Sequence, residues 1–487
     1  MMVRPFLSLD ENALLFRLSD YAMRQRLADA VPRVITPILL ASCLALGGAS
    51  AAGHVANAVL QLIALACIVA ILSRREMPRL PTPAIALLGI YGLAATIMVM
   101  QLVPLPPSLW HMLPGHRTAW TTLGLARVDA PWAPISLAPE ATLGCLLSLL
   151  PPVAITLSVF SSDALGRRYS FVVVVAVSLG SIALGIAQIF GGENSSLYPY
   201  AITNRGSAVG LFANRNHLAT LLLSSLPVLT ALIDTRRDAP RRMLHLGLVG
   251  AGILILSLGV VLIGSRAGLG LLLPTLAVTL LFMLRNGESR RMGMRHWVLA
   301  AILPCLAALA FGASLPENGD TKGSSLAALH RPVIVATTLR AARDYLPWGS
   351  GGGSFRTVYP AYEDPAAVSL EYVNHAHCDP AELALEYGVP GLLVAALTLL
   401  LLASRAGPAW QLAGRAGTEA RAALAILAII VLSGFVDYPM RTAAVASLAA
   451  MAAAMVAMPR PVVRVSAFGR QRGEREPHRL AISTDEM

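Results

Sequence analysis

Long apolar stretches separated by short polar segments dominate this chain. Each stretch runs for about 20 residues without the alternation of apolar and polar positions that a half-buried strand shows. A helix of about 20 residues crosses the hydrocarbon core of a bilayer. The pattern predicts an all-α polytopic membrane protein of about 12 transmembrane helices, near 34–53, 56–73, 84–103, 141–160, 169–190, 213–233, 243–264, 267–284, 297–314, 383–403, 421–436 and 441–458.

Composition supports a membrane protein rather than a soluble one. The 487 residues are 56% hydrophobic and only 13% charged, whereas a soluble domain carries about 25% charged residues. Within lipid, every backbone polar group must find a partner in the chain, which leaves helices or a closed barrel as spanning structures. The length of the apolar runs favours helices.

The distribution of arginine predicts the orientation. With the N-terminus inside, the inward segments hold 27 of the 38 basic residues, as the positive-inside rule requires. The net charge of +11 therefore reflects topology and indicates no nucleic-acid partner. We expect three parts with both ends in the cytoplasm: an amphipathic segment at 1–33, a transmembrane domain at 34–458 and a basic tail at 459–487.

Two outward segments are longer than a simple connection. The segment 104–140 is rich in Pro and Trp, which suits the membrane interface. The segment 315–382 contains many Gly, Tyr and charged residues, and loops of this length are usually functional or disordered. Its aromatic content favours a folded periplasmic loop with short helices, one of them over 332–346.

The outward segment before the span at 213–233 has the features of an anion site. Asn214 can cap the helix, and Arg205 and Arg215 add positive charge beside the exposed amides of its first turn. Arg266 lies between two spans with almost no loop, so we expect it to face a polar cavity or an anion. The alternative is that these arginines only anchor the helix ends at the interface.

The long outward segment contributes further polar candidates. Arg340 and Arg343 are three residues apart on one face of the expected helix, and a glycine run at 349–353 precedes Arg356. Glycines allow a close backbone approach to a ligand. No Lys-Ser or Lys-Thr follows them, so a nucleotide loop is excluded, and a hinge without a ligand is the alternative.

Two histidines precede the span at 383–403. Asp379 is a good helix cap, so His377 lies just before the positive end of a helix, which disfavours its protonated form. A neutral imidazole at the outer surface can act as a general base. His375 and His377 could also bind a metal ion, but no third ligand is evident nearby, and this interpretation is the weaker one.

Together these segments resemble the O-antigen ligase family, which includes O-antigen and exopolysaccharide polymerases. The resemblance covers about residues 200–440 and rests on the order of four weak motifs and one short turn. They are Arg205 with Gly210-Leu211-Phe212-Ala213-Asn214-Arg215-Asn216, Ser265-Arg266-Ala267-Gly268, Pro347 to Phe355 with Tyr359-Pro360, His377 with Glu386-Tyr387-Gly388, and Asp437-Tyr438-Pro439. Cys378 stands where the family usually has Asn, and Pro380 where it often has a larger residue.

The resemblance implies an inverting glycosyltransferase that needs no metal and no cofactor. Such proteins transfer a glycan from undecaprenyl pyrophosphate on the periplasmic side of the inner membrane. Arg205 and Arg266, with Arg215 as a helper, would hold the pyrophosphate, and His377 would take a proton from the acceptor sugar. Supporting roles would fall to Asn214, Asn216, His375, Glu386, Arg340 and Arg356. The chain has no Asp-x-Asp pair, so arginine rather than a metal–carboxylate pair is expected to hold phosphate.

Three functions fit these observations. A ligase would transfer a finished glycan to lipid A-core, and a polymerase would extend a lipid-linked chain. The motif layout favours the ligase narrowly. A polysaccharide transporter is the third possibility, but the ionisable residues gather at the outer rim instead of the span centres, whereas a transport pathway needs polar groups on both halves.

Overall fold

The computed structural model describes residues 33–50, 53–74, 79–232, 239–285, 322–365, 368 and 372–458. The expected span at 297–314, the amphipathic segment before Arg33 and the basic tail lie outside these residues. The described part is helical, with one isolated β-bridge between Leu105 and Ala133. After a first helix at Arg33–Leu46, its elements are α2 (His54–Leu72), α3 (Thr82–Leu102), α4 (Pro107–Trp110), α5 (Arg117–Leu125), α6 (Pro139–Leu147), α7 (Leu150–Ser161), α8 (Ala164–Gly191), α9 (Arg215–Leu232), α10 (Ala239–Ile263), α11 (Arg266–Arg285), α13 (Lys322–Tyr345), α14 (Phe355–Val358), η2 (Tyr359–Ala361), α15 (Asp379–Gln411), α16 (Gly414–Gly434), η4 (Pro439–Arg441) and α17 (Ala443–Ala457).

Eight of these helical segments are long and apolar enough to cross a membrane. The helix at Arg33–Leu46 and α17 are apolar but shorter, and α9 carries Arg215, Asn216 and His217 in its first turn. The all-α membrane architecture is therefore confirmed. The expected number of twelve spans is not confirmed. One expected span lies outside the described residues, and three of the described helices fall short of the length or hydropathy of a crossing segment.

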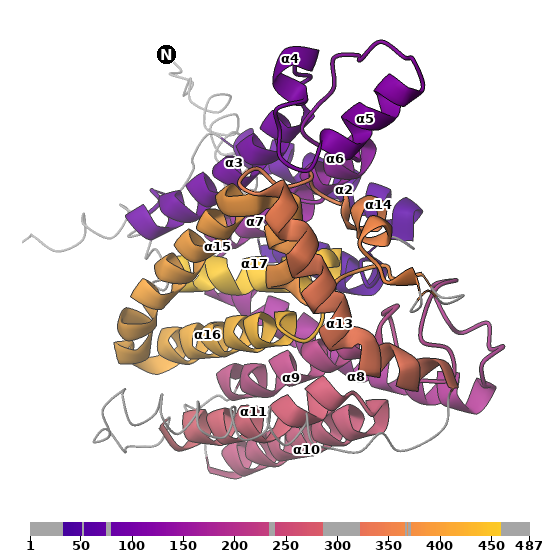
Figure 1. Ribbon diagram of the computed structural model, residues 1–487. Helices are drawn as coiled ribbons and strands as arrows, with labels where there is room; N and C mark the ends of the chain where they lie inside the picture. The colour runs from indigo at the N-terminus through magenta and orange to yellow at the C-terminus, as the bar shows by residue number, and fades with distance from the viewer. Residues whose placement is uncertain are drawn as a thin grey trace, which may run out of the picture.

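The last helix, α17, lies in the core of the bundle. Thirteen of its 15 residues are buried, and it packs against α7, α16 and α15 (Figure 1). Its sequence is mostly Ala with a few Met, Val and Leu. Small side chains let neighbouring helix backbones approach closely, which is the usual basis of helix packing in membranes. On the far side of α16, α9 packs against α8, α10 and α11.

A small outer subdomain covers one end of the bundle. Its apolar core includes Ile334, Tyr345, Phe355, Tyr359 and Leu385, which come from α13, α14, η2 and the start of α15. Figure 1 shows α13 running obliquely across the other helices. The helix expected at 332–346 begins earlier, at Lys322. Pro332 lies inside it rather than in its first turn, because one missing backbone donor does not stop a helix that packs along α15.

Helix α15 belongs both to the outer subdomain and to the helix bundle, because it bends at Gly388. Gly388 has φ +58° and ψ −147°, far from helical values. A Cβ at this position would collide with the carbonyl oxygen of Pro347, so glycine is required by conformation and by space. The first two turns, which carry Glu382 and Glu386, lie in the outer subdomain, and the remainder continues as an apolar span.

Candidate active site

The centre of the site is a buried carboxylate in the turn between α16 and α17. Asp437 is 2% exposed. Its Oδ1 lies 3.0 Å from Nδ1 of His377. Its Oδ2 accepts hydrogen bonds from the side-chain amides of Asn214 at 3.0 Å and Asn216 at 2.6 Å. One aspartate thus joins the histidine before α15 to the start of α9, although the three segments lie far apart in the sequence.

The two asparagines are themselves held by helix caps. Asn214 Oδ1 accepts the backbone N–H of Asn216 at 2.8 Å, which confirms the predicted cap of α9. Ser265 accepts the backbone N–H of Gly268 at the start of α11 and donates its hydroxyl to Asn216 Oδ1 at 2.8 Å. With both carbonyl oxygens accepting, the amide nitrogens must face Asp437. Local capping therefore orients the groups that surround the carboxylate.

The surroundings of Asp437 keep it ionised. Burial alone raises the pKa of this carboxyl, but the hydrogen bond with His377 and the charges of His217, His377 and Arg331 outweigh burial, and the pKa lies well below its ordinary value. An ionised carboxylate can only accept a hydrogen bond, so Nδ1 of His377 donates to it. In the neutral ring, the lone pair is then on Nε2, where a proton can be taken up.

His377 combines this orientation with access. Its side chain is 20% exposed, and its backbone has φ +50°, an uncommon value for a residue with a side chain. Strained backbone of this kind persists where its surroundings hold it in place, often at functional sites. Within the described residues, His377 forms a hydrogen bond through Nδ1 alone, which leaves Nε2 available to a ligand.

His375 is arranged differently, because both of its ring nitrogens are engaged. Nδ1 lies 2.8 Å from Glu382 Oε1, and Nε2 lies 3.2 Å from the hydroxyl of Ser50. Its side chain is 12% exposed. The Tyr438 ring contacts both histidines, with centroids 4.1 Å from His375 and 5.1 Å from His377. The geometry therefore favours His377 over His375 as a proton acceptor.

Three arginines interact electrostatically with one another, and one of them, Arg331, also acts on Asp437. Arg215 and Arg266 are the first residues of α9 and α11. Electrostatic repulsion links Arg215 to both Arg266 and Arg331. Arg331, on α13, also donates to the carbonyl of Val436 at 3.4 Å and acts on the charge of Asp437. Like charges this close are costly unless an anion joins them, and two lie at helix N-termini, which themselves favour anions.

Other arginines singled out from the sequence have other partners. Arg205 is exposed, donates to the carbonyl of Glu193 at 2.9 Å and lies over the Tyr198 ring. Arg340 donates to the carbonyl of Tyr362 at 3.0 Å, and Arg356 is exposed on α14. The structure thus brings Arg215, Arg266, Asn214, Asn216 and His377 together. Among the described contacts, none joins Arg205, Arg340 or Arg356 to this group.

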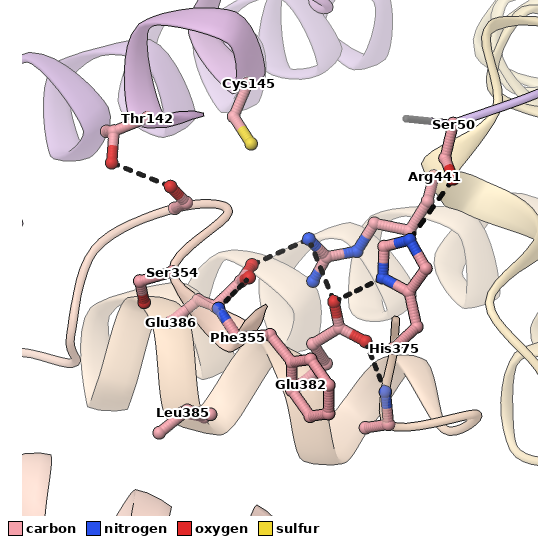
Figure 2. Close-up of polar contacts among 12 residues, drawn as sticks. Ser50, Thr142, Cys145, Ser354, Phe355, His375, Glu382, Leu385, Glu386 and Arg441 are labelled. Atoms are coloured by element: carbon pink, nitrogen blue, oxygen red, sulfur yellow. Dashed lines mark hydrogen bonds and ion pairs between the residues drawn. The ribbon is translucent and has the colours of Figure 1, made fainter. Parts of the chain in front are cut away.

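Glu386 belongs to a second polar cluster beside the first. It receives Arg441 Nη1 at 2.7 Å and the backbone N–H of Phe355 at 3.3 Å. Arg441 Nη1 also lies 3.5 Å from Oε1 of Glu382, the partner of His375 (Figure 2). The two histidines bind different carboxylates, so their ring nitrogens do not point at a common ligand position. No group of three or more His, Cys, Asp or Glu side chains suited to a metal ion occurs in the described chain.

Sequence reasoning missed several members of these clusters. We expected Asp379 as a cap, but α15 begins at Asp379 itself. Glu382, which received no role, is buried against His375 and the backbone of Ala376. Arg331, Asp437 and Arg441 also received no role from the residue patterns. One signal was available, because Asp437 and Arg441 are the only charged residues between two apolar spans.

Comparison with known protein families finds a match to the O-antigen ligase family over residues 251–396. The matched region begins in α10, ends in α15, and includes Arg266, Arg331 and His377. No curated protein matches the chain. The match confirms the resemblance predicted from the motifs. Residues 251–396 therefore match a domain of the O-antigen ligase family, within a protein that has several helices able to cross a membrane, and this match supports glycan transfer of the ligase or polymerase type.

Proposed function

We propose that this protein is an O-antigen ligase of the bacterial inner membrane. It transfers a glycan from undecaprenyl pyrophosphate to a sugar of lipid A-core. The observation that supports this most directly is a partly exposed histidine that donates to an ionised carboxylate, on which Arg331 acts, with Arg215 and Arg266 close to Arg331 or to one another. Arginine is in excess in the segments on the side of the membrane opposite this site. By the positive-inside rule, both ends of the chain then lie in the cytoplasm and this site lies at the periplasmic face.

The arginines supply the binding site for the donor. A pyrophosphate diester carries two negative charges, and Arg215, Arg266 and Arg331 carry three positive ones. Guanidinium groups remain charged at any physiological pH and bind phosphate oxygens through two parallel N–H bonds. This set differs from the one expected from the sequence, because Arg331 takes the place of Arg205.

Transfer needs one displacement. An acceptor hydroxyl oxygen attacks the anomeric carbon of the donor as the bond from that carbon to the pyrophosphate oxygen breaks. The bonding electrons leave with undecaprenyl pyrophosphate, where the arginines stabilise the developing charge. Nε2 of His377 takes the hydroxyl proton, Asp437 stabilises the imidazolium that forms, and the proton then passes to water. Attack opposite the leaving group inverts the anomeric configuration.

Deletion of the gene tests the function directly. We expect cells without it to lack O-chain on lipid A-core and to accumulate full-length glycan on the lipid carrier. Reintroduction of the wild-type gene should restore the ladder of long lipopolysaccharide on a gel. Core molecules capped by a single repeat unit, or loss of a free exopolysaccharide, would instead identify a polymerase. Unchanged surface glycan would contradict both forms of glycan transfer.

Arg331 provides a test of donor binding. We expect Arg331→Ala to raise KM for the carrier-linked donor on the order of 10- to 100-fold, because one hydrogen-bonded charge is lost. Arg331→Lys should recover part of this loss, since lysine restores the positive charge but not the two parallel N–H bonds of a guanidinium. The measurement is the initial transfer rate at varied donor concentration. The control is Arg117→Ala, an exposed arginine at the start of α5. An unchanged KM in the folded Arg331→Ala protein would remove Arg331 from the donor site.

A further inference from the structure

A buried charge cluster lies next to the His377 site and has no part in the proposed proton transfer. Arg441 Nη1 lies 2.7 Å from Glu386 Oε2 and 3.5 Å from Glu382 Oε1. The two carboxylate side chains are 0% and 1% exposed. They lie one turn apart on α15, before the bend at Gly388, so one guanidinium holds both (Figure 2).

Besides Arg441, each carboxylate contacts a different segment of the chain. Glu382 accepts from the backbone N–H of Ala376 at 2.9 Å and contacts Nδ1 of His375 at 2.8 Å. His377 follows Ala376 directly in the sequence. Glu386 accepts from the backbone N–H of Phe355, at the end of the glycine-rich segment 349–355. Arg441 therefore links the histidine segment 374–378 to the glycine-rich segment through two buried ions.

The same turn also holds the reacting histidine. Asp437, the partner of His377, lies four residues before Arg441, between α16 and α17. One short turn thus binds the His377 side chain through Asp437 and the neighbouring backbone through Arg441 and Glu382. Charged hydrogen bonds fix direction more strictly than apolar contacts do, and they form around a residue whose backbone has φ +50°.

We propose that Arg441 is a positioning residue for glycan transfer. Through Glu382 it fixes the backbone that presents His377, and through Glu386 it fixes the glycine-rich segment relative to it. The inference rests on the proposed function, because the residue that it positions is the proposed base. It assigns no contact between Arg441 and the substrate. Loss of the cluster should therefore lower kcat while leaving the binding of the donor intact.

The kinetic test uses purified protein in lipid nanodiscs, with carrier-linked glycan extracted from cells that lack the gene as donor. We expect Glu382→Gln to lower kcat about 10- to 100-fold, as loss of outer-shell partners commonly does, with KM for the donor unchanged within about twofold. Arg441→Gln should lower kcat at least as much, and Arg441→Lys should recover part of it. The matched control is Glu419→Gln, which removes a buried carboxylate from its pair with Arg167 near the starts of α16 and α8.

A second measurement does not depend on transfer. Hydrogen–deuterium exchange should increase in residues 374–378 of Glu382→Gln and in residues 351–355 of Glu386→Gln, each without a comparable change in the other segment. Arg441→Lys should increase exchange in both. Wild-type kcat in a folded Glu382→Gln protein, an equal loss in Glu419→Gln, or unchanged exchange in both segments would overturn the positioning role. Absence of transfer by the wild type would instead overturn the proposed function, while the exchange measurement still decides the role of Arg441.

Discussion

Replacement of His377 by alanine is expected to abolish glycan transfer, with a loss of about 10²- to 10⁴-fold in kcat, the range that general bases contribute. The reason is specific to this ring, because its Nδ1 donates to Asp437 and its Nε2 is left to accept a proton. Transfer should be measured from the carrier-linked donor in nanodiscs and by restoration of long lipopolysaccharide in deleted cells.

His375→Ala is the matched comparison for this variant. His375 is two residues away and touches the same tyrosine, but both its nitrogens are engaged by Glu382 and Ser50. We expect this variant to retain more activity than His377→Ala. A folded His377→Ala protein with full activity would reject the proposed base, and a complete loss in His375→Ala alone would transfer that role to His375.

Asp437→Asn is expected to produce the second large effect, a fall in kcat on the order of 10³-fold. The change keeps the size of the side chain but replaces an acceptor by an amide that can also donate, so the imidazole is no longer held with its hydrogen on Nδ1. An equivalent change in a serine protease triad costs about 10⁴-fold for this reason. KM for the donor should change little, because the arginines remain.

The pH dependence sharpens this test. A depressed carboxyl pKa means that ionised Asp437 stabilises the folded protein above the ordinary carboxyl range, and that this contribution disappears only as the pH falls through the lower folded-state value. Asp437 therefore stays ionised from about pH 5 to pH 9, and the defect of Asp437→Asn should persist across that interval. Recovery of activity within it would contradict the orienting role of the carboxylate.

Much of the fold follows from apolar periodicity and helix caps. Runs such as 84–103 and 169–190 are close to the observed α3 and α8 because a bilayer selects for length and hydropathy alone. The start of α9 was predictable from Asn214, whose side chain satisfies a free backbone donor. The outer subdomain was less predictable, since α13 depends on tertiary packing along α15 rather than on local signals.

The residues of the candidate site also differ in how far the sequence could predict them. Arg215, Arg266 and His377 stand out because polar residues at helix starts are locally conspicuous. Asp437 contacts a histidine 60 residues earlier in the sequence, and Arg441 contacts a glutamate 55 residues earlier. No local sequence pattern predicts which distant group will face them. The position of Arg205 likewise depends on Glu193 and Tyr198 in its own loop.

The central position of α17 has a consequence for how the protein is made. Helices enter the membrane in the order of synthesis, from the N-terminus onward. The hairpin of α16 and α17 is the last described pair to emerge, yet α17 fills the middle of the bundle and its preceding turn supplies Asp437 and Arg441. Until this hairpin arrives, His377 lacks its carboxylate, so under the proposed mechanism we expect a chain that ends before α16 to transfer no glycan.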